Sequence, residues 1–330
     1  MTTMERENEI GPLQPIGALR TQPAGERAAE FFERRGRSVF AGAGAWWASV
    51  DSGSRSYLSC SEHLVLSATP AEVSAALGRH GAIAAQYATA EAGCPSGVFL
   101  ITDREYGIEQ VQKRMRNMVR KGLKHFEIRP VEKHEMLERG IAINLETMTR
   151  HELFRPEFSE PALWRRNVDA IYGMNGPVCM GAFEAGVLMS YVFGVIDDGV
   201  LFLMVQKTVD RALELHANPA LTFETCRAAF GSGQVRAVSV GTMPFLNSPN
   251  LHQFKTRMGF ELHPYNMRIE LHPALEKLAG PGMVGFAARF GAKVPIVGAR
   301  IERQAKLLQL GKGYVTPETS VKEEAEDAGN

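Results

Sequence analysis

The stretch "SVGTMPFLNSPNLHQFKTRMGFELHPYNMRIEL", residues 239–271, holds the end of an apolar strand, a polar loop, a short helix and a further strand. Ser248 is placed to be the N-cap of this helix, and Pro249 takes its first position, where a missing N–H is tolerated. One apolar face is formed by Leu251, Phe254 and Met258. Their spacing predicts a helix that ends at Gly259 and leads into the last strand.

The segment before this stretch predicts a crossover between parallel strands. Asn218 as N-cap and Pro219 as the first helical residue predict a helix that ends at Gly231. The run "VRAVSVG", residues 235–241, is apolar almost throughout, as expected for a strand buried on both faces. A strand, a helix and a strand in this order favour a parallel pair joined by a right-handed crossover.

Three apolar runs upstream predict an antiparallel meander. They cover residues 178–183, 187–196 and 200–206. Only Glu184-Ala185-Gly186 and Asp197-Asp198-Gly199 connect them. Connections this short require hairpins, so all three strands are expected to be antiparallel neighbours.

The region from Ser38 to about Thr102 predicts short strands around one helix. "SYLSC" (56–60) and "EHLVLSA" (62–68) alternate loosely, and "SGVFLIT" (96–102) is typical of a buried strand. Thr69 as N-cap and Pro70 at the first position predict a helix between them.

A second helix is expected from about residue 108 to residue 124, with an apolar face and a basic face. The basic face carries Lys113, Arg114, Arg116, Arg120, Lys121 and Lys124. Such a face is usually a solvated surface, and contact with polyphosphate or tRNA is the alternative.

Composition limits the classes of function. The chain has 37 basic and 37 acidic residues, which argues against a protein that coats DNA. Its cysteines, Cys60, Cys94, Cys179 and Cys226, are too widely spaced for a Cys-x-x-Cys motif, so we expect reduced thiols, no metal site and a cytoplasmic protein. The longest apolar run, residues 185–196, is about half of a membrane span, so none is expected.

The order of these elements, a meander, a crossover helix, a central strand, a helix and a closing strand, resembles the GNAT acyltransferase fold. "LHQFKTRMGF" (251–260) looks like the fourth helix of that fold, and the basic stretch 113–129 is similar to the junction of FemAB-like proteins, which carry two GNAT-like halves. The resemblance implies an α/β mixed sheet with GNAT-like halves at 38–125 and 126–272. We expect a partly disordered arm (1–37), peripheral helices (273–315) and a disordered acidic tail (316–330) around them.

What the resemblance implies for function is acyl transfer from acyl-CoA to an amine of a small molecule or peptide, by direct attack in a ternary complex. In this fold the fourth and fifth strands separate, and the acyl thioester enters the gap. The usual phosphate cradle is rich in glycine, whereas the corresponding segment here, residues 205–222, contains none. Two alternatives therefore stay open, an aminoacyl-tRNA-dependent FemAB-like transferase and a non-catalytic binding or scaffold protein.

The candidate site residues follow from this resemblance and from strand ends. Donor-binding candidates are Gln206, Thr208, Asn218, Asn250 and Lys255. Acceptor-binding candidates are Gly241 and Thr242, and the catalytic candidates are Glu184 and Ser239. For Lys255 the alternative is a solvated lysine whose aliphatic stem covers the core.

Overall fold

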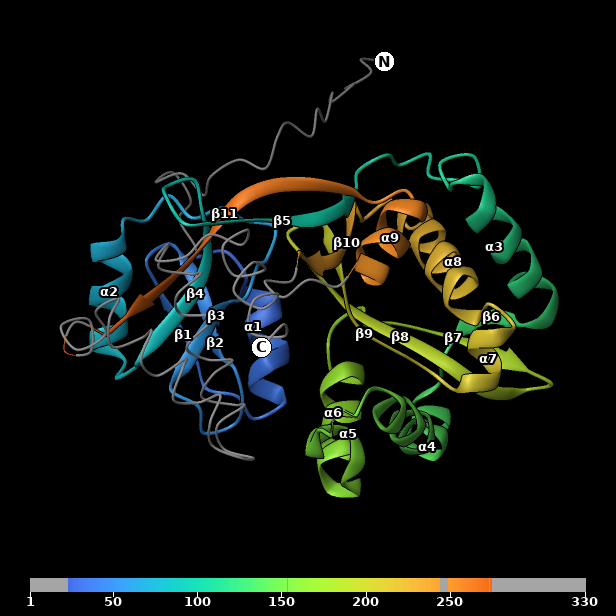
Figure 1. Ribbon diagram of the computed structural model, residues 1–330. Coiled ribbons are helices and arrows are strands. Elements are labelled where there is room, and N and C mark those ends of the chain that lie inside the picture. Colours follow the sequence, from blue (N-terminus) through green and yellow to red (C-terminus); the bar gives the residue numbers. More distant parts are fainter. Residues whose placement is uncertain (1–22, 153, 244–248, 273, 275–330) are drawn as a thin grey trace, which may run out of the picture.

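The computed structural model describes residues 23–152, 154–243, 249–272 and 274 (Figure 1). The predicted N-cap Ser248, the C-terminal extension and the acidic tail lie outside these residues, apart from Ala274. The described part of the chain forms one mixed sheet in the strand order β1-β2-β3-β4-β11-β5-β10-β9-β8-β7-β6. The strands are β1 (Val39–Gly42), β2 (Ala45–Ser49), β3 (Ser56–Ser59), β4 (Ala84–Thr89), β5 (Cys94–Ile101), β6 (Glu127–Pro130), β7 (Val178–Glu184), β8 (Val187–Asp197), β9 (Val200–Thr208), β10 (Ala237–Thr242) and β11 (Glu261–Leu271).

Helices flank this sheet. They are α1 (Glu26–Arg34), α2 (Pro70–Arg79), α3 (Lys113–His125), α4 (Lys133–His151), α5 (Pro156–Ser159), α6 (Pro161–Tyr172), α7 (Asp210–Glu214), α8 (Ala217–Gly231) and α9 (Pro249–Arg257). Figure 1 shows α3 and α8 on one face of β7–β9, and α4, α5 and α6 on the other. Each face has its own buried core, one around Phe223, Cys226 and Leu201 and the other around Trp164, Tyr191 and Phe193.

The meander and the crossover are confirmed. β7, β8 and β9 are antiparallel neighbours, and β9 and β10 are parallel, connected through α7 and α8. Ala185-Gly186 and Asp198-Gly199 all have positive φ, the conformation that a two-residue hairpin turn requires. The predicted capping of α2 is also confirmed, since Thr69 and Glu72 form a reciprocal capping box.

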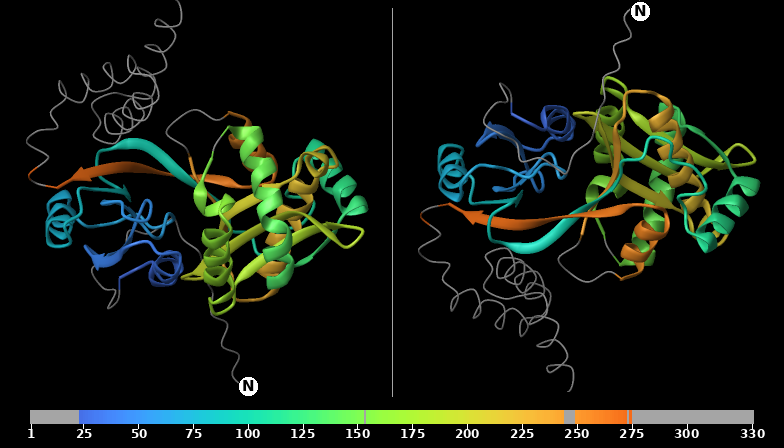
Figure 2. Two further views of the ribbon diagram at one scale, coloured as in Figure 1. Left: turned by 90° about the horizontal axis from the view of Figure 1, so that it is seen from below. Right: turned by 90° about the horizontal axis from the view of Figure 1, so that it is seen from above.

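The two ends of the sheet are joined by long-range pairing. β11 pairs with β4 over its C-terminal half and with β5 over its N-terminal half, and β5 also pairs with β10. Figure 2 shows β5 and β11 running side by side from one half of the molecule to the other. The predicted domain boundary between residues 125 and 126 remains a prediction. Strands from both sides of this boundary belong to the same sheet.

Two local expectations are wrong. Residues 62–68 form no strand beyond a single bridge at Leu66, because consecutive residues from His63 to Leu66 are all buried and the pattern does not alternate. Asn218 is not an N-cap, because α8 begins at Ala217, two residues before the predicted start at Pro219, and follows His216 in the left-handed region. The part of the N-terminal arm that forms α1 packs into the core, since Phe31 is fully buried.

Candidate functional site

The strands β9 and β10 separate part-way along their length. They pair only at Val200, Leu201 and Phe202 of β9. Beyond Ser239 the register of β10 against β5 shifts, and Thr242 pairs with Val98 of β5. β9 continues to Thr208 and pairs there with β8 alone. The separation that the resemblance implied is therefore present.

A cleft of about 470 Å³ lies at this separation. One wall comes from residues 203–207 of β9, the end of β10 and α5. The other wall comes from α1, the residues that follow it, β3 and the loop after β3. Because these segments belong to the N-terminal and C-terminal parts of the chain, the whole fold is needed to form the cleft.

One end of the cleft is rich in cations, namely Arg35, Arg37, Arg155 and Lys207. The cleft lining at this end includes an acid, Glu157, which lies 3.7 Å from Arg155. Arg35 is held by a 2.7 Å hydrogen bond to Asn167 and lies over the ring of Phe158.

Arg155 is exposed, but the partial burial of Arg35, Arg37 and Lys207 has an electrostatic cost. The pKa of Arg35 is lowered to about 10, mainly by burial and to a smaller extent by repulsion from Arg37. Burial, followed by Arg155 and Arg150, also lowers the pKa of Lys207. An excess of partly buried positive charge that faces a cleft favours an anionic ligand.

Near the end of β10, a carboxylate that lines the cleft and a buried ammonium influence each other's pKa, although the lysine is not part of the cleft wall. Glu62, in the loop after β3, faces the cleft and is open to solvent there, but the surrounding protein raises its pKa, and Lys255 opposes this shift. Lys255 on α9 is only 4% exposed, so the solvated-lysine alternative is wrong. Burial lowers its pKa to about 8, and Glu62 opposes this shift.

The acceptor candidates come together with Lys255. Its Nζ donates a 3.1 Å hydrogen bond to the backbone oxygen of Thr242, and Gly241 lines the cleft beside Glu62. Ser239 is fully buried, and its hydroxyl accepts the N–H of Gly241. Asn250 is exposed in the first turn of α9.

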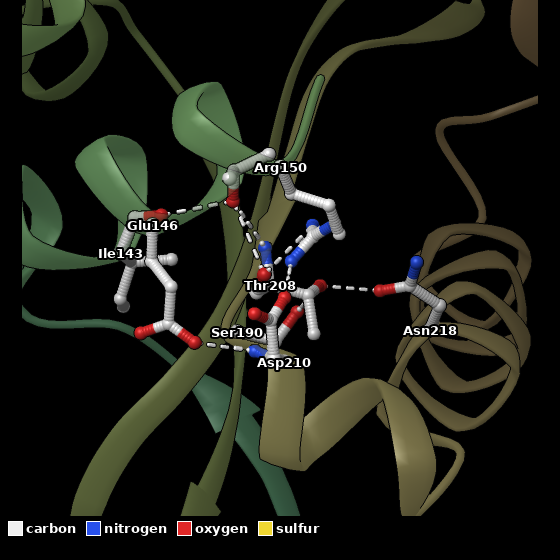
Figure 3. Close-up of polar contacts among 8 residues, drawn as sticks. Ile143, Glu146, Arg150, Ser190, Thr208, Asp210 and Asn218 are labelled. Carbon is white, nitrogen blue, oxygen red and sulfur yellow. Dashed lines mark hydrogen bonds and ion pairs between the residues drawn. The ribbon is translucent and has the colours of Figure 1, made fainter. Parts of the chain in front are cut away.

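Three donor candidates bond to one another. Thr208 lies between Ser190, Asn218 and Arg150 (Figure 3), and its hydroxyl bonds to the Asn218 side chain. Gln206 lines the cleft, and its amide nitrogen lies 3.3 Å from the Asn218 side-chain oxygen. Thr208 is 2% exposed, so its side chain is occupied by protein partners.

The other catalytic candidate, Glu184, does not line the cleft. It ends β7 and accepts a 2.8 Å hydrogen bond from Arg211. Sequence reasoning missed Glu62 and the four cations. The only local signal was that Glu62 is the single acid in the run "SCSEHLV". The four cations gave no local signal, because residues that are distant in sequence form the cleft.

The start of α8 is packed inside the protein. Ala217, Ala220 and Leu221 are fully buried there. A Cβ at Gly122 of α3 would lie 2.5 Å from the backbone oxygen of His216, so α3 covers this end closely. The first turn of α8 therefore presents no open set of backbone N–H groups to a phosphate.

The basic face of α3 remains on the surface. Lys113, Arg114, Arg120, Lys121 and Lys124 are exposed and form no ion pair with another described residue, whereas Arg116 pairs with Glu109. Within the described ranges, no group of three or more His, Cys, Asp or Glu residues is arranged to hold a metal ion. In the same ranges, no helix has the length and apolarity needed to cross a membrane.

Comparison with known proteins supports the fold. No family model matches the chain, and no curated protein matches its sequence. The structure of FemX matches with a TM-score of 0.54 at 11% identity, over 76% of this chain and 92% of that chain. L-PGS from Bacillus licheniformis matches with a TM-score of 0.50 at 11% identity, over 77% of this chain and 94% of that chain. A tandem GNAT protein from the clavulanic acid biosynthesis pathway matches with a TM-score of 0.43 at 9% identity, over 69% and 78%.

The predicted α/β mixed sheet and the resemblance to FemAB-like proteins are confirmed as a statement about fold. At these identities the similarity concerns architecture, and activity has to be argued from the cleft. The chain has the FemX-like fold, with a GNAT-type separation of its central strands.

Proposed function

We propose that the protein transfers an activated acyl group to an amine, and that donor and acceptor meet in the cleft beside Lys255 and Glu62. The observation that carries the proposal is this pair of opposite charges at the end of β10, where β9 and β10 separate. Direct attack of an amine on an ester or thioester needs a proton acceptor and positive charge near the carbonyl oxygen. It needs no covalent nucleophile on the protein.

Each residue of the pair has a distinct role in this proposal. The Lys255 ammonium, fixed by Thr242, stabilises the negative charge that develops on the carbonyl oxygen. Glu62, whose pKa is raised by its surroundings, accepts a proton from the attacking amine. A carboxylate with a raised pKa in a cleft is suited to this task at neutral pH.

The cationic end of the cleft binds an anionic group of one substrate. Arg35, Arg37 and Lys207 come from both parts of the chain, so a phosphate or carboxylate between them bridges the two walls. Such a ligand offsets the burial, and then the repulsion by neighbouring arginines, that lower the pKa of Arg35 and Lys207. Substrate binding is then expected to stabilise the fold by linkage.

Two observations favour aminoacyl-tRNA as the donor. The buried, glycine-free start of α8 supplies no cradle for the pyrophosphate of CoA. The exposed cations of α3 supply a surface for the phosphate backbone of RNA. Acyl-CoA is the second candidate, favoured by the separation of β9 and β10 and by Gln206 at its edge.

Titration of the full-length protein with deacylated tRNA and, separately, with CoA and acetyl-CoA tests the choice of donor. The proposal predicts tRNA binding that weakens steeply with salt and that falls about tenfold or more in Arg114→Glu/Arg120→Glu. Arg79→Glu/Arg165→Glu, which makes the same change of charge at exposed residues of α2 and α6, is the matched control and is expected to bind more nearly like wild type. Binding of CoA without binding of tRNA would make acyl-CoA the donor in place of aminoacyl-tRNA. Binding of neither ligand would favour the scaffold alternative.

A further inference from the structure

Glu62 is an exposed residue between two buried ones. Ser61 is 3% exposed and His63 is 2% exposed, whereas Glu62 faces the cleft. The three residues lie in the loop after β3 and belong to no strand. Because the ladder of the sheet does not hold this loop, the position of the Glu62 carboxylate depends on the contacts that its two neighbours make.

Both neighbours contact the β8–β9 hairpin, in the C-terminal part of the chain. The Ser61 hydroxyl donates a 2.9 Å hydrogen bond to Oδ2 of Asp197, the last residue of β8. The ring centroid of His63 lies 5.0 Å from that of Phe202 on β9, and Phe202 also lines the cleft. Glu62 is therefore bracketed by two buried contacts that join its loop to the hairpin whose second strand forms the opposite wall.

Asp197 also holds the start of α1. Its Oδ1 accepts the backbone N–H of Arg27, in the first turn of α1, at 3.3 Å. Gly25, the N-cap of this helix, makes no side-chain capping bond, so Asp197 supplies from β8 the acceptor and the negative charge that favour a helix N-terminus. One carboxylate thus connects β8 both to the loop of Glu62 and to the helix that leads to Arg35.

The burial of this carboxylate is costly. Asp197 is 4% exposed, and burial raises the pKa of its carboxyl, a shift that the hydrogen bonds from Ser61 and from the Arg27 N–H oppose. A contact that served packing alone could be made by a neutral side chain of similar shape without this desolvation penalty. A residue that costs stability beside a candidate catalytic group is typical of a site shaped for function.

We propose that Asp197 is a positioning residue that, through Ser61, fixes the Glu62 carboxylate at the cleft. This inference rests on the proposed acyl transfer and identifies the residue that supports its proton acceptor. Asp197 itself is not part of the cleft wall, so it acts through Ser61 and not on a substrate. A catalytic group that is displaced by about 1 Å can lose about 100-fold in rate, so the position of Glu62 matters for transfer.

The pKa of Lys255 reports the position of Glu62 without any substrate. Burial lowers the pKa of Lys255 to about 8, and Glu62 opposes this shift. If Glu62 moves away, its opposition is lost and the pKa of Lys255 falls further. The measurement is an NMR titration of the full-length protein, ¹³C-labelled at the lysine Cε atoms, with Lys255→Arg to identify the resonance. Glu62→Gln gives the value for complete loss of the carboxylate.

Ser61→Ala is the decisive variant, because it removes the contact without changing any charge. The pKa of Lys255 is expected to fall in Ser61→Ala towards its value in Glu62→Gln. Ser49→Ala is the matched control, since it removes the hydroxyl of another fully buried serine, which accepts the N–H of Ser38 at 3.0 Å, and should leave the pKa of Lys255 unchanged. An unchanged pKa in Ser61→Ala, or an equal fall in both variants, would overturn the proposal.

Two substitutions at Asp197 separate position from charge. Asp197→Ala removes both hydrogen bonds and is expected to lower the pKa of Lys255 as Ser61→Ala does. Asp197→Asn removes the charge but keeps the shape, because its oxygen can accept the Arg27 N–H while its amide donates to the Ser61 oxygen. This variant is expected to restore the pKa of Lys255 close to the wild-type value. An equal fall in both variants would mean that the charge acts on Lys255 directly, and would overturn the positioning role.

Failure of this inference and failure of the proposed function give different results. If both hold, kcat/KM for transfer to n-pentylamine, a probe amine, is expected to fall about tenfold or more in Ser61→Ala. Wild-type transfer together with a Lys255 pKa that Ser61→Ala leaves unchanged would remove the positioning role and keep the function. A Lys255 pKa that depends on Ser61 and Asp197, in a protein that transfers from neither donor, would keep the positioning of Glu62 and remove the function.

Discussion

The ammonium of Lys255 donates a 3.1 Å hydrogen bond to the backbone oxygen of Thr242, 13 residues earlier in the chain. This contact fixes α9 against β10 at the residue where β10 has left β9 and pairs with β5. The same ammonium lies 4.7 Å from the ring centroid of Phe99 on β5. A buried positive charge is thus held at the point where the two central strands separate.

The pH dependence of transfer is the first prediction. Activity requires ionised Glu62 and protonated Lys255, so kcat/KM is expected to rise with pH through the raised pKa of Glu62, above 4.5, and to fall as pH passes about 8. Glu62→Gln is expected to lower kcat about 100-fold or more and to remove the acidic limb. The measurement is the pH–rate profile of each protein.

Lys255→Arg separates the titration of the enzyme from that of the acceptor amine. Arginine stays charged throughout the measurable range, so this variant is expected to keep activity above pH 8 and to lose the basic limb. If the basic limb stays at about pH 8 in Lys255→Arg, Lys255 is not the group that titrates.

The cationic end of the cleft gives a second prediction. Lys207→Met removes a charge that burial and two arginines disfavour, so the free energy of unfolding is expected to rise by about 1 kcal/mol. Affinity for inorganic pyrophosphate, as a probe anion, is expected to fall about tenfold. Lys121→Met, on the exposed face of α3, is the control and should change neither quantity much. Unchanged pyrophosphate affinity in Lys207→Met would remove Lys207 from the anion site.

Thr208 provides a third prediction, because its hydroxyl is bonded to Ser190 and Asn218. Thr208→Val is expected to lower the free energy of unfolding by about 1–3 kcal/mol and to leave donor affinity unchanged. The measurements are denaturant unfolding and donor titration of the folded variant. Loss of donor affinity at unchanged stability would instead support the donor-binding role expected from the sequence.

The close packing of α3 on α8 gives a fourth prediction. Gly122→Ala places a methyl group 2.5 Å from the His216 oxygen and 2.7 Å from the Ala220 Cβ, so it is expected to cost about 1–3 kcal/mol. Gly231→Ala, at the end of α8, meets no atom within 4 Å and is expected to raise stability by up to about 1 kcal/mol. Chemical denaturation of both variants checks this pair, and equal effects would contradict the described packing.

Local signals were sufficient for the elements that local chemistry determines. The Asp198-Gly199 turn predicted the β8–β9 hairpin, because few residues other than glycine, asparagine and aspartate accept positive φ. The start of α8 was predicted wrongly, because proline is tolerated throughout the first turn of a helix, so Pro219 does not define its first residue.

The site itself required long-range information. Glu62 and Lys255 are far apart in sequence, and they influence each other's pKa because β11 inserts between β4 and β5 and brings the preceding helix α9 near the loop after β3. No periodicity or capping pattern encodes that pairing. The cation cluster of the cleft could not be predicted for the same reason, since Arg35 follows α1 and Lys207 lies near the end of β9, far away in sequence.

The most direct test of the account is single-turnover transfer from a pool of radiolabelled aminoacyl-tRNAs to n-pentylamine, with acetyl-CoA as the parallel donor, in wild type and in Lys255→Met. The account predicts labelled amide at a rate well above aminolysis in solution, and a loss of about 100- to 1,000-fold in Lys255→Met with the fold intact. A wild-type rate equal to that of solution aminolysis with both donors, or an unchanged rate in Lys255→Met, would contradict it.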